Sequence, residues 1–197
     1  MNEIGGNALL ARVGALYHDI GKMEHPEYFI ENQKYLKNPH DDLKDEESAK
    51  KIIEHVTKGV EMAKQYGLPE QIIKFIRTHH GSSRVEYFYR NYLKKNPKGR
   101  VDEGKFRYPG PKPFSKETAV AMLVDSVEAA SRSLQQPNEQ QLEELIDRLI
   151  DGKLEDKQLD NADITMREIN IIRNRLKKLM KSIFHVRVQY PSEKAKA

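Results

Sequence analysis

Six residues of two chemical kinds, histidine and aspartate, stand out as possible metal ligands. They are His18, Asp19, His55, His79, His80 and Asp125. Imidazole nitrogens mixed with carboxylate oxygens suit Fe, Mn, Zn or Ni better than Ca²⁺, and the absence of cysteine argues against a structural zinc site. Six ligands are too many for one ion that also keeps an open position. The set therefore predicts two divalent metal ions close together, bridged by a carboxylate.

The pair His18-Asp19 lies at the end of an apolar run with helical periodicity. Leu9, Val13 and Leu16 recur at steps of three and four residues, which is typical of a helix with one buried face. Neighbouring residues on a helix point about 100° apart, so these two side chains can share a metal ion only if other segments supply further ligands.

Each remaining candidate also has an ordinary structural explanation. His55 borders the apolar face of its helix, where a lone histidine more often has a structural role. The pair His79-His80 follows an apolar helix and could simply cap its end. Asp125 interrupts an apolar helical segment, where a carboxylate is costly unless a cation or several donors compensate it, but it could equally lie on a polar edge. The metal-centre hypothesis depends on whether these residues meet.

The periodic segments predict an all-α fold of about seven helices, since Leu, Ile, Glu, Lys, Gln and Ala dominate them. With 197 residues the chain can bury a core, and we predict one domain over residues 1–190. Residues 186–190 alternate in the manner of a short strand. Residues 191–197 are expected to form a disordered tail.

The predicted helices are joined by two long irregular segments. The helices are expected at residues 4–22 (or from 7), 46–66, 69–79, 84–95, 115–134, 138–153 and 166–184. Residues 138 and 141, and more clearly 165 and 168, have the spacing of capping boxes. The irregular segments are 23–45 and the proline-rich 96–114, and connections of this length are usually functional or disordered.

Charge and hydropathy exclude some kinds of partner. The net charge of +4 is too small and too dispersed to indicate a nucleic acid polymer. The basic stretch 90–100 contains no acid and could meet an anion, although a solvated loop is the commoner reason for such a stretch. The longest apolar run, residues 119–124, is too short to cross a bilayer, and no signal peptide opens the chain. These features predict a soluble piece of chain, and the lack of cysteine suits a reducing compartment without proving one.

The histidine and aspartate pattern resembles the metal-binding pattern of the HD-domain phosphohydrolase superfamily. Three loops narrow the resemblance: residues 29–33 (FIENQ), 38–41 (NPHD) and 106–113 (FRYPGPKP). They are similar to those of the cytosolic HD domain of bacterial seven-transmembrane HD proteins, the PgpH-type phosphodiesterases. The resemblance covers residues 8–190. It implies an HD-type helical bundle that converts cyclic di-AMP to the linear dinucleotide pApA in the bacterial cytoplasm. The bundle would be attached to a membrane only through segments absent from this chain. A homodimer is possible, but the sequence does not decide it.

The resemblance also implies roles for single residues. Asp19 would bridge two metal ions, with Fe and Mn expected, and a metal-activated hydroxide would attack phosphorus. His18 and Asp125 would complete one metal site, and His55 with the pair His79-His80 would complete the other.

Four further residues would serve the substrate. Lys22 would add positive charge near the scissile phosphate, although a surface salt bridge is its ordinary alternative. His40, Arg107 and Tyr108 would help to bind substrate, with bracing of the loop as the alternative for His40.

One departure from the family pattern matters. The family pattern begins with a further histidine upstream of the His-Asp pair, and none of the seventeen residues before His18 is a histidine. His25 could substitute only from a loop after the pair. Either the chain lacks the N-terminal helices of a full domain or one metal site is weakened. A catalytically weak or inactive module that binds cyclic dinucleotides therefore stays open, as does a general HD nucleotide phosphohydrolase.

Overall fold

The structure is a computed structural model that describes residues 1–33, 38–97, 99, 101–134 and 137–185. This described part contains seven α-helices and several short 3-10 turns, and no strand, which confirms the all-α prediction. The helices are α1 (Ala8–Tyr17), α2 (Asp45–Gln65), α3 (Glu70–Thr78), α4 (Glu86–Lys95), α5 (Lys116–Ser131), α6 (Glu139–Glu155) and α7 (Met166–His185). The predicted strand at 186–190 and the tail at 191–197 lie outside the described residues.

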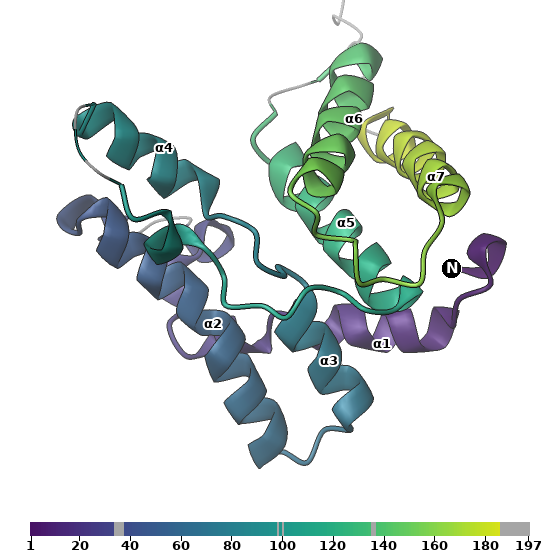
Figure 1. The fold of residues 1–197 in the computed structure, drawn as a ribbon, viewed down its shortest axis with the longest axis horizontal. Helices are drawn as coiled ribbons and strands as arrows, with labels where there is room; N and C mark the ends of the chain where they lie inside the picture. Colours follow the sequence, from purple (N-terminus) through teal and green to yellow (C-terminus); the bar gives the residue numbers. More distant parts are fainter. Residues whose placement is uncertain (34–37, 98, 100, 135–136, 186–197) are drawn as a thin grey trace, which may run out of the picture.

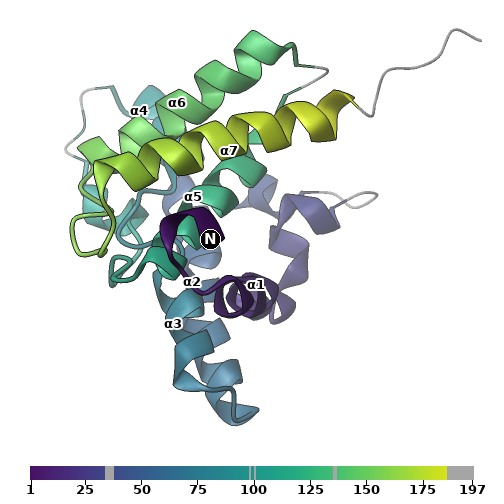
Figure 2. The ribbon, with the colours of Figure 1, turned by 90° about the vertical axis from the view of Figure 1, so that its right-hand side faces the viewer.

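The helices form two groups that α1 joins. Figure 1 shows α2, α3 and α4 on one side and α5, α6 and α7 on the other, and α1 packs against both α3 and α5. In the turned view of Figure 2, α6 and α7 run side by side. The larger core lies between α5, α6 and α7 and includes Met122, Ile146 and Ile150, all fully buried. A smaller core, with Ile73 and Ile76, lies between α2 and α3.

Side-chain caps fix where several helices begin. The predicted capping box of α6 is present: Asn138 accepts a hydrogen bond from the Gln141 backbone N–H at 2.8 Å, and Gln141 accepts one from the Asn138 N–H at 3.0 Å. The predicted box at α7 is present too, with 2.8 Å between the Thr165 nitrogen and a Glu168 carboxylate oxygen. These reciprocal bonds satisfy backbone donors that a helix start leaves without partners.

The end of the first helix differs from the prediction. The sequence predicted helix as far as Lys22, but α1 ends at Tyr17, and the 3-10 turn η2 (Ile20–Met23) follows. This turn packs closely on α2: a Cβ built on Gly21 would lie 1.9 Å from the carbonyl oxygen of His55. Periodicity could not predict this end, because it is set by contact with a helix that lies far away in the sequence.

The segment between η2 and α2, predicted as irregular, is a series of short turns. They are η3 (Pro26–Tyr28), η4 (Ile30–Asn32) and η5 (Pro39–Asp42). Asn38 caps the last of them by accepting a hydrogen bond from the His40 backbone N–H at 3.1 Å. These turns carry the side chains that border the candidate site.

Replacing Glu168 with glutamine should reduce the loss of stability in acid. Lys116 on α5 pairs with Glu168 on α7, and this contact lowers the pKa of Glu168 from 4.5 to about 2. A lowered pKa stabilises the fold fully above pH 4.5, and that stabilisation is lost as the pH falls toward 2. Glutamine keeps the capping geometry but does not titrate. Thermal unfolding midpoints between pH 6 and pH 2 should therefore fall more steeply for the wild type than for Glu168→Gln, and parallel curves would contradict this prediction.

Candidate metal centre

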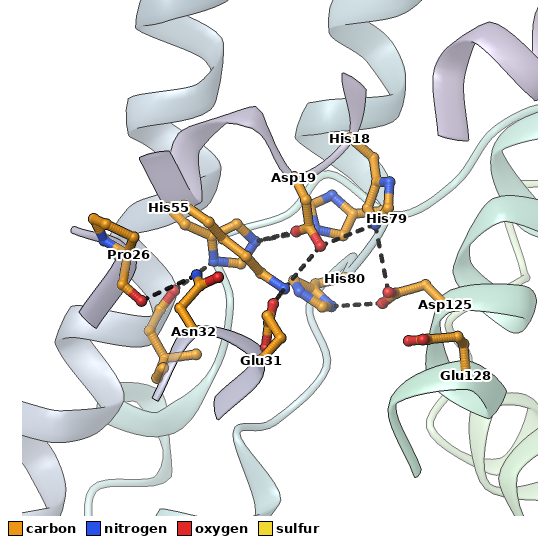
Figure 3. Close-up of polar contacts among 12 residues, drawn as sticks. His18, Asp19, Pro26, Glu31, Asn32, His55, His79, His80, Asp125 and Glu128 are labelled. Atoms are coloured by element: carbon orange, nitrogen blue, oxygen red, sulfur yellow. Dashed lines mark hydrogen bonds and ion pairs between the residues drawn. The ribbon is translucent and has the colours of Figure 1, made fainter. Parts of the chain in front are cut away.

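The six residues predicted as metal ligands come together in space (Figure 3). His55 lies on α2 and Asp125 on α5. The pair His18-Asp19 directly follows α1, and the pair His79-His80 directly follows α3, so both groups of helices contribute. Their donor atoms form two sets, each with all members within 4.8 Å of one another. One set contains Asp19, His55, His79 and His80, and the other contains His18, Asp19 and Asp125. Asp19 is the residue shared by both sets.

The two carboxylates lie among the imidazole rings. Asp19 Oδ1 is 3.4 Å from His55 Nε2 and 3.6 Å from His79 Nε2, and its other oxygen is 3.2 Å from His18 Nε2. The Asp125 carboxylate is 3.4 Å from His18 Nε2. Its second oxygen is 3.8 Å from Nδ1 of His80. Each carboxylate therefore lies close to two or more of the histidine nitrogens.

Backbone carbonyls orient three of the four rings in the same way. The Nδ1 atoms lie 2.9 Å from the Ala15 oxygen for His18, 2.6 Å from the Ile52 oxygen for His55, and 2.9 Å from the Ile76 oxygen for His79. A carbonyl can only accept, so each Nδ1 carries the proton and donates it. Nε2 of each ring is the atom that faces the cluster, as is usual for a metal ligand fixed by a second hydrogen bond.

The donor atoms of this cluster are arranged to bind cations rather than to form hydrogen bonds with one another. His18 Nε2 and Asp19 Oδ1 are buried and form no well-directed hydrogen bond, although neighbours of the cluster lie 3.2–3.6 Å from them. The Nε2 atoms of His55 and His79 face each other at 3.1 Å, an unfavourable contact for two neutral rings whose protons are on Nδ1. Buried polar atoms without partners are costly, and divalent ions would satisfy all of these atoms. The residues present therefore fit divalent metal ions.

Burial and charge set the protonation of the cluster. Burial lowers the pKa of His55 to about 4, and burial also holds the pKa of His80 well below its usual value. Both rings are thus neutral at pH 7, the form that binds metals. Burial opposes ionisation of Asp19, but contacts with His18 and His79 and the charge of Lys22 outweigh it, so the pKa of Asp19 lies far below its usual range.

His18 behaves differently from the other rings. Burial lowers its pKa, but contacts with Asp125 and Asp19 outweigh burial and raise the pKa to about 10. A proton on His18 thus lies between the two carboxylates when no metal is bound. A metal ion at this position must displace that proton, since a ligating nitrogen has to be deprotonated.

Lys22 lies at the edge of the cluster, together with a carboxylate that the sequence did not indicate. The ammonium nitrogen of Lys22 is 2.8 Å from Asp19 Oδ2 and 2.8 Å from Glu31 Oε1. It also lies 5.1 Å from the centre of the Phe29 ring. Glu31 belongs to the irregular segment, where no periodicity marks it, and only its place in the FIENQ loop could have singled it out.

The other three residues predicted to bind substrate have different surroundings. The Tyr108 ring stacks on His80, with centroids 4.2 Å apart, and Tyr108 itself is buried. Burial and the charges of Asp125 and Asp19 raise the pKa of its hydroxyl, which therefore stays protonated. His40 lies beside Tyr28, 2.9 Å from its carbonyl oxygen, in a neighbouring hollow.

Arg107, by contrast, is fully engaged in bracing the fold. It forms ion pairs with Glu103 and Asp156, at 2.6 and 3.1 Å, and donates a hydrogen bond to the Ser82 carbonyl oxygen at 2.8 Å. These contacts join the segment after α3 to the end of α6. His25, considered as a substitute for the upstream histidine, lies near Glu27 and outside both donor sets.

One hollow borders the cluster, and a second lies on the other side of the η4 turn. A cavity of about 490 Å³ lies beside His18 and Asp125, between α1 and α5. A second, of about 590 Å³, lies between the short turns and α4 and is lined by aromatic rings, including that of Phe88. Ile30 and Glu31 line both hollows, so the η4 turn stands between them. Each hollow is large enough for part of a small-molecule ligand.

No helix among the described residues is both long and apolar enough to cross a membrane.

Comparison with known proteins assigns the fold to a family. The HD domain family model matches residues 1–130. The chain is 45% identical over 188 residues to cyclic-di-AMP phosphodiesterase PgpH of Bacillus subtilis and 44% identical over 193 residues to PgpH of Listeria monocytogenes. These alignments cover 95% and 98% of this chain but only 26% and 27% of the relatives, so the chain spans about a quarter of their length.

A solved structure is similar over a larger share of its own length. The crystal structure of the HD domain of L. monocytogenes phosphodiesterase PgpH in complex with cyclic-di-AMP superimposes with a TM-score of 0.88 and 43% sequence identity. The match covers 92% of this chain and 84% of that one. The predicted metal ligands gather in one cluster, and the chain matches the family in sequence and in fold. The chain therefore belongs to the HD domain family.

Proposed function

We propose that this chain is a metal-dependent phosphodiesterase domain that hydrolyses cyclic di-AMP to the linear dinucleotide pApA in the bacterial cytoplasm. The observation that carries the proposal is the pair of donor sets joined by Asp19, in a chain 43% identical to an HD domain crystallised with cyclic-di-AMP. Both PgpH relatives are named as phosphodiesterases of this nucleotide. The proposal concerns the reaction of this domain alone, because the chain spans about a quarter of the length of these relatives.

The residues of the two sets would hold two divalent ions, with Fe or Mn expected from the mixed nitrogen and oxygen donors. Divalent ions at such a site supply Lewis-acid chemistry to a phosphodiester. The carbonyl bonds at Nδ1 keep the rings aimed at the cluster, so little reorganisation is needed when the site fills. Lys22 holds the Asp19 carboxylate and places positive charge at the edge of the site. The Tyr108 hydroxyl, which stays protonated beside His80, would donate to a substrate oxygen.

A second function is favoured by the difference between the two sets. One set has four donor residues, whereas the set with His18 and Asp125 has three among the described residues. The second metal would then bind more weakly, and the domain could hold a cyclic dinucleotide without cleaving it. This binding module is the alternative to the phosphodiesterase.

Hydrolysis of cyclic di-AMP by the purified chain, with and without metal, tests the proposal. Protein loaded with Mn²⁺ should convert cyclic di-AMP to pApA without releasing inorganic phosphate, as chromatography of the products would show. A chelator should abolish turnover, and added Mn²⁺ should restore it, because the cluster alone provides no Lewis acid. Release of inorganic phosphate would indicate a nucleotidase instead. Binding of the nucleotide by loaded protein without any cleavage would support the binding module.

A further inference from the structure

Lys153 is a partly buried lysine whose charge has no carboxylate partner. It lies near the end of α6, and its ammonium donates a hydrogen bond to the Ser83 hydroxyl at 2.7 Å. Ser83 is itself buried, with 8% of its surface exposed. Within the described ranges Lys153 forms no ion pair. A desolvated ammonium that directly contacts no carboxylate is costly for a protein to keep.

The other cations around the cluster are already neutralised. Lys22 contacts both Asp19 and Glu31 at 2.8 Å. Arg132 pairs with Glu128 at 2.6 Å and lies 3.5 Å from Glu31. Arg107 is paired as described above. Each of these cations would have to share or give up a carboxylate in order to bind an anionic ligand.

The position of Lys153 is fixed relative to the cluster. Ser83 follows His80 by three residues, and its carbonyl oxygen accepts a hydrogen bond from the Tyr108 N–H at 3.0 Å. The fully buried Gln158 holds the preceding residue, accepting a hydrogen bond from the Ser82 N–H at 2.9 Å. The segment that aims the Lys153 ammonium is therefore the one that carries His80.

Electrostatic effects place the Lys153 charge in the field of the same cluster. Burial lowers the pKa of Lys153, and the charges of Asp125 and Asp156 oppose that effect. The geometry places the ammonium on the same side, because Ser83, which Lys153 contacts, donates its backbone N–H to the His80 carbonyl oxygen at 3.0 Å.

We propose that Lys153 binds a phosphate oxygen of the cyclic dinucleotide and is a substrate-binding residue of this domain. The inference rests on the proposed function, whose substrate carries two phosphodiester groups. The metal cluster can neutralise one of them, and the second needs a cation that is not already paired. Lys153 meets that need. The competing structural role is a tether that holds α6 to the segment after His80.

Two substitutions separate the ligand from the tether. Lys153→Met removes both the charge and the hydrogen bond, whereas Ser83→Ala removes only the hydrogen bond. Kinetics of metal-loaded protein should show the KM for cyclic di-AMP raised about tenfold in Lys153→Met, the size expected for one charge-assisted hydrogen bond, with kcat changed less than about threefold. Ser83→Ala should raise KM less than about threefold. Lys153→Arg should recover most of the affinity, and the exposed Lys178→Met should match the wild type.

Other results would overturn the assignment of Lys153. An unchanged KM in Lys153→Met would do so. Equal increases in KM in Lys153→Met and Ser83→Ala, with equal losses of thermal stability, would also do so and would identify a tether. Calorimetric binding of cyclic di-AMP, measured in parallel, separates this inference from the proposed function. If the wild type binds without cleaving, the phosphodiesterase proposal fails, and a dissociation constant about tenfold higher in Lys153→Met still supports the lysine, whereas equal constants reject it. If the wild type does not bind, both proposals fail.

Discussion

Asp19→Asn is expected to remove metal binding at both positions and to lower the rate of cyclic di-AMP hydrolysis by about a hundredfold to a thousandfold. Asp19 belongs to both donor sets, and its pKa is held far below the usual range, so it is ionised at every working pH. Asparagine has the same shape but no charge, and its single oxygen cannot serve two ions in the same way. Metal content per chain by elemental analysis, with hydrolysis assayed on the same samples, measures both effects.

A matched control for this prediction is Asp160→Asn, the same chemical change at an exposed position between α6 and α7. It should keep the metal content and turnover of the wild type. The prediction would be wrong if Asp19→Asn retained two ions per chain and near-normal turnover. Loss of turnover with full metal content would show that Asp19 acts on the reaction in some way other than by holding the ions.

The contrast between Asp19 and Glu31 shows how far the sequence could predict the site. Histidines and aspartates in apolar helical segments were recognisable because a buried polar group needs a partner, and all six proved to lie in one cluster. Glu31 and Lys153 had no such signal. Glu31 lies in an irregular segment, and Lys153 resembles any other basic residue near a helix end until the packing of α6 against the segment after α3 is known.

Helix boundaries followed the same logic. Starts marked by local chemistry, such as the boxes at Asn138 and Thr165, were predictable because the capping bonds join residues three apart. The end of α1 was not, because it depends on a contact between Gly21 and α2, more than thirty residues away. Sequence periodicity indicates which face of a helix is buried, but it does not show where two helices come close enough to exclude a methyl group.

Gly21→Ala should therefore damage both the fold and the metal centre. An added Cβ would lie 1.9 Å from the His55 carbonyl oxygen, 2.5 Å from the Gly59 nitrogen and 2.8 Å from the Gly59 Cα. All three are backbone atoms of α2, so no side chain can rotate away, and the η2 turn must move. We expect the free energy of unfolding to fall by about 3 kcal/mol or more, which corresponds to a drop of roughly 6–12 °C in melting temperature.

The same displacement separates ligands that η2 and α2 contribute. Asp19 directly precedes the turn, and His55 supplies both the obstructed carbonyl and a ring 3.4 Å from the Asp19 carboxylate. Metal content should fall along with stability. Gly152→Ala is the matched control, since nothing lies within 4 Å of its added Cβ on α6, and alanine there should stabilise the helix by about 0.5–1 kcal/mol. Because both variants add one methyl group to a glycine, a difference between them measures the contact of η2 with α2. If Gly21→Ala melts at the wild-type temperature with its metals retained, that contact does not position the centre.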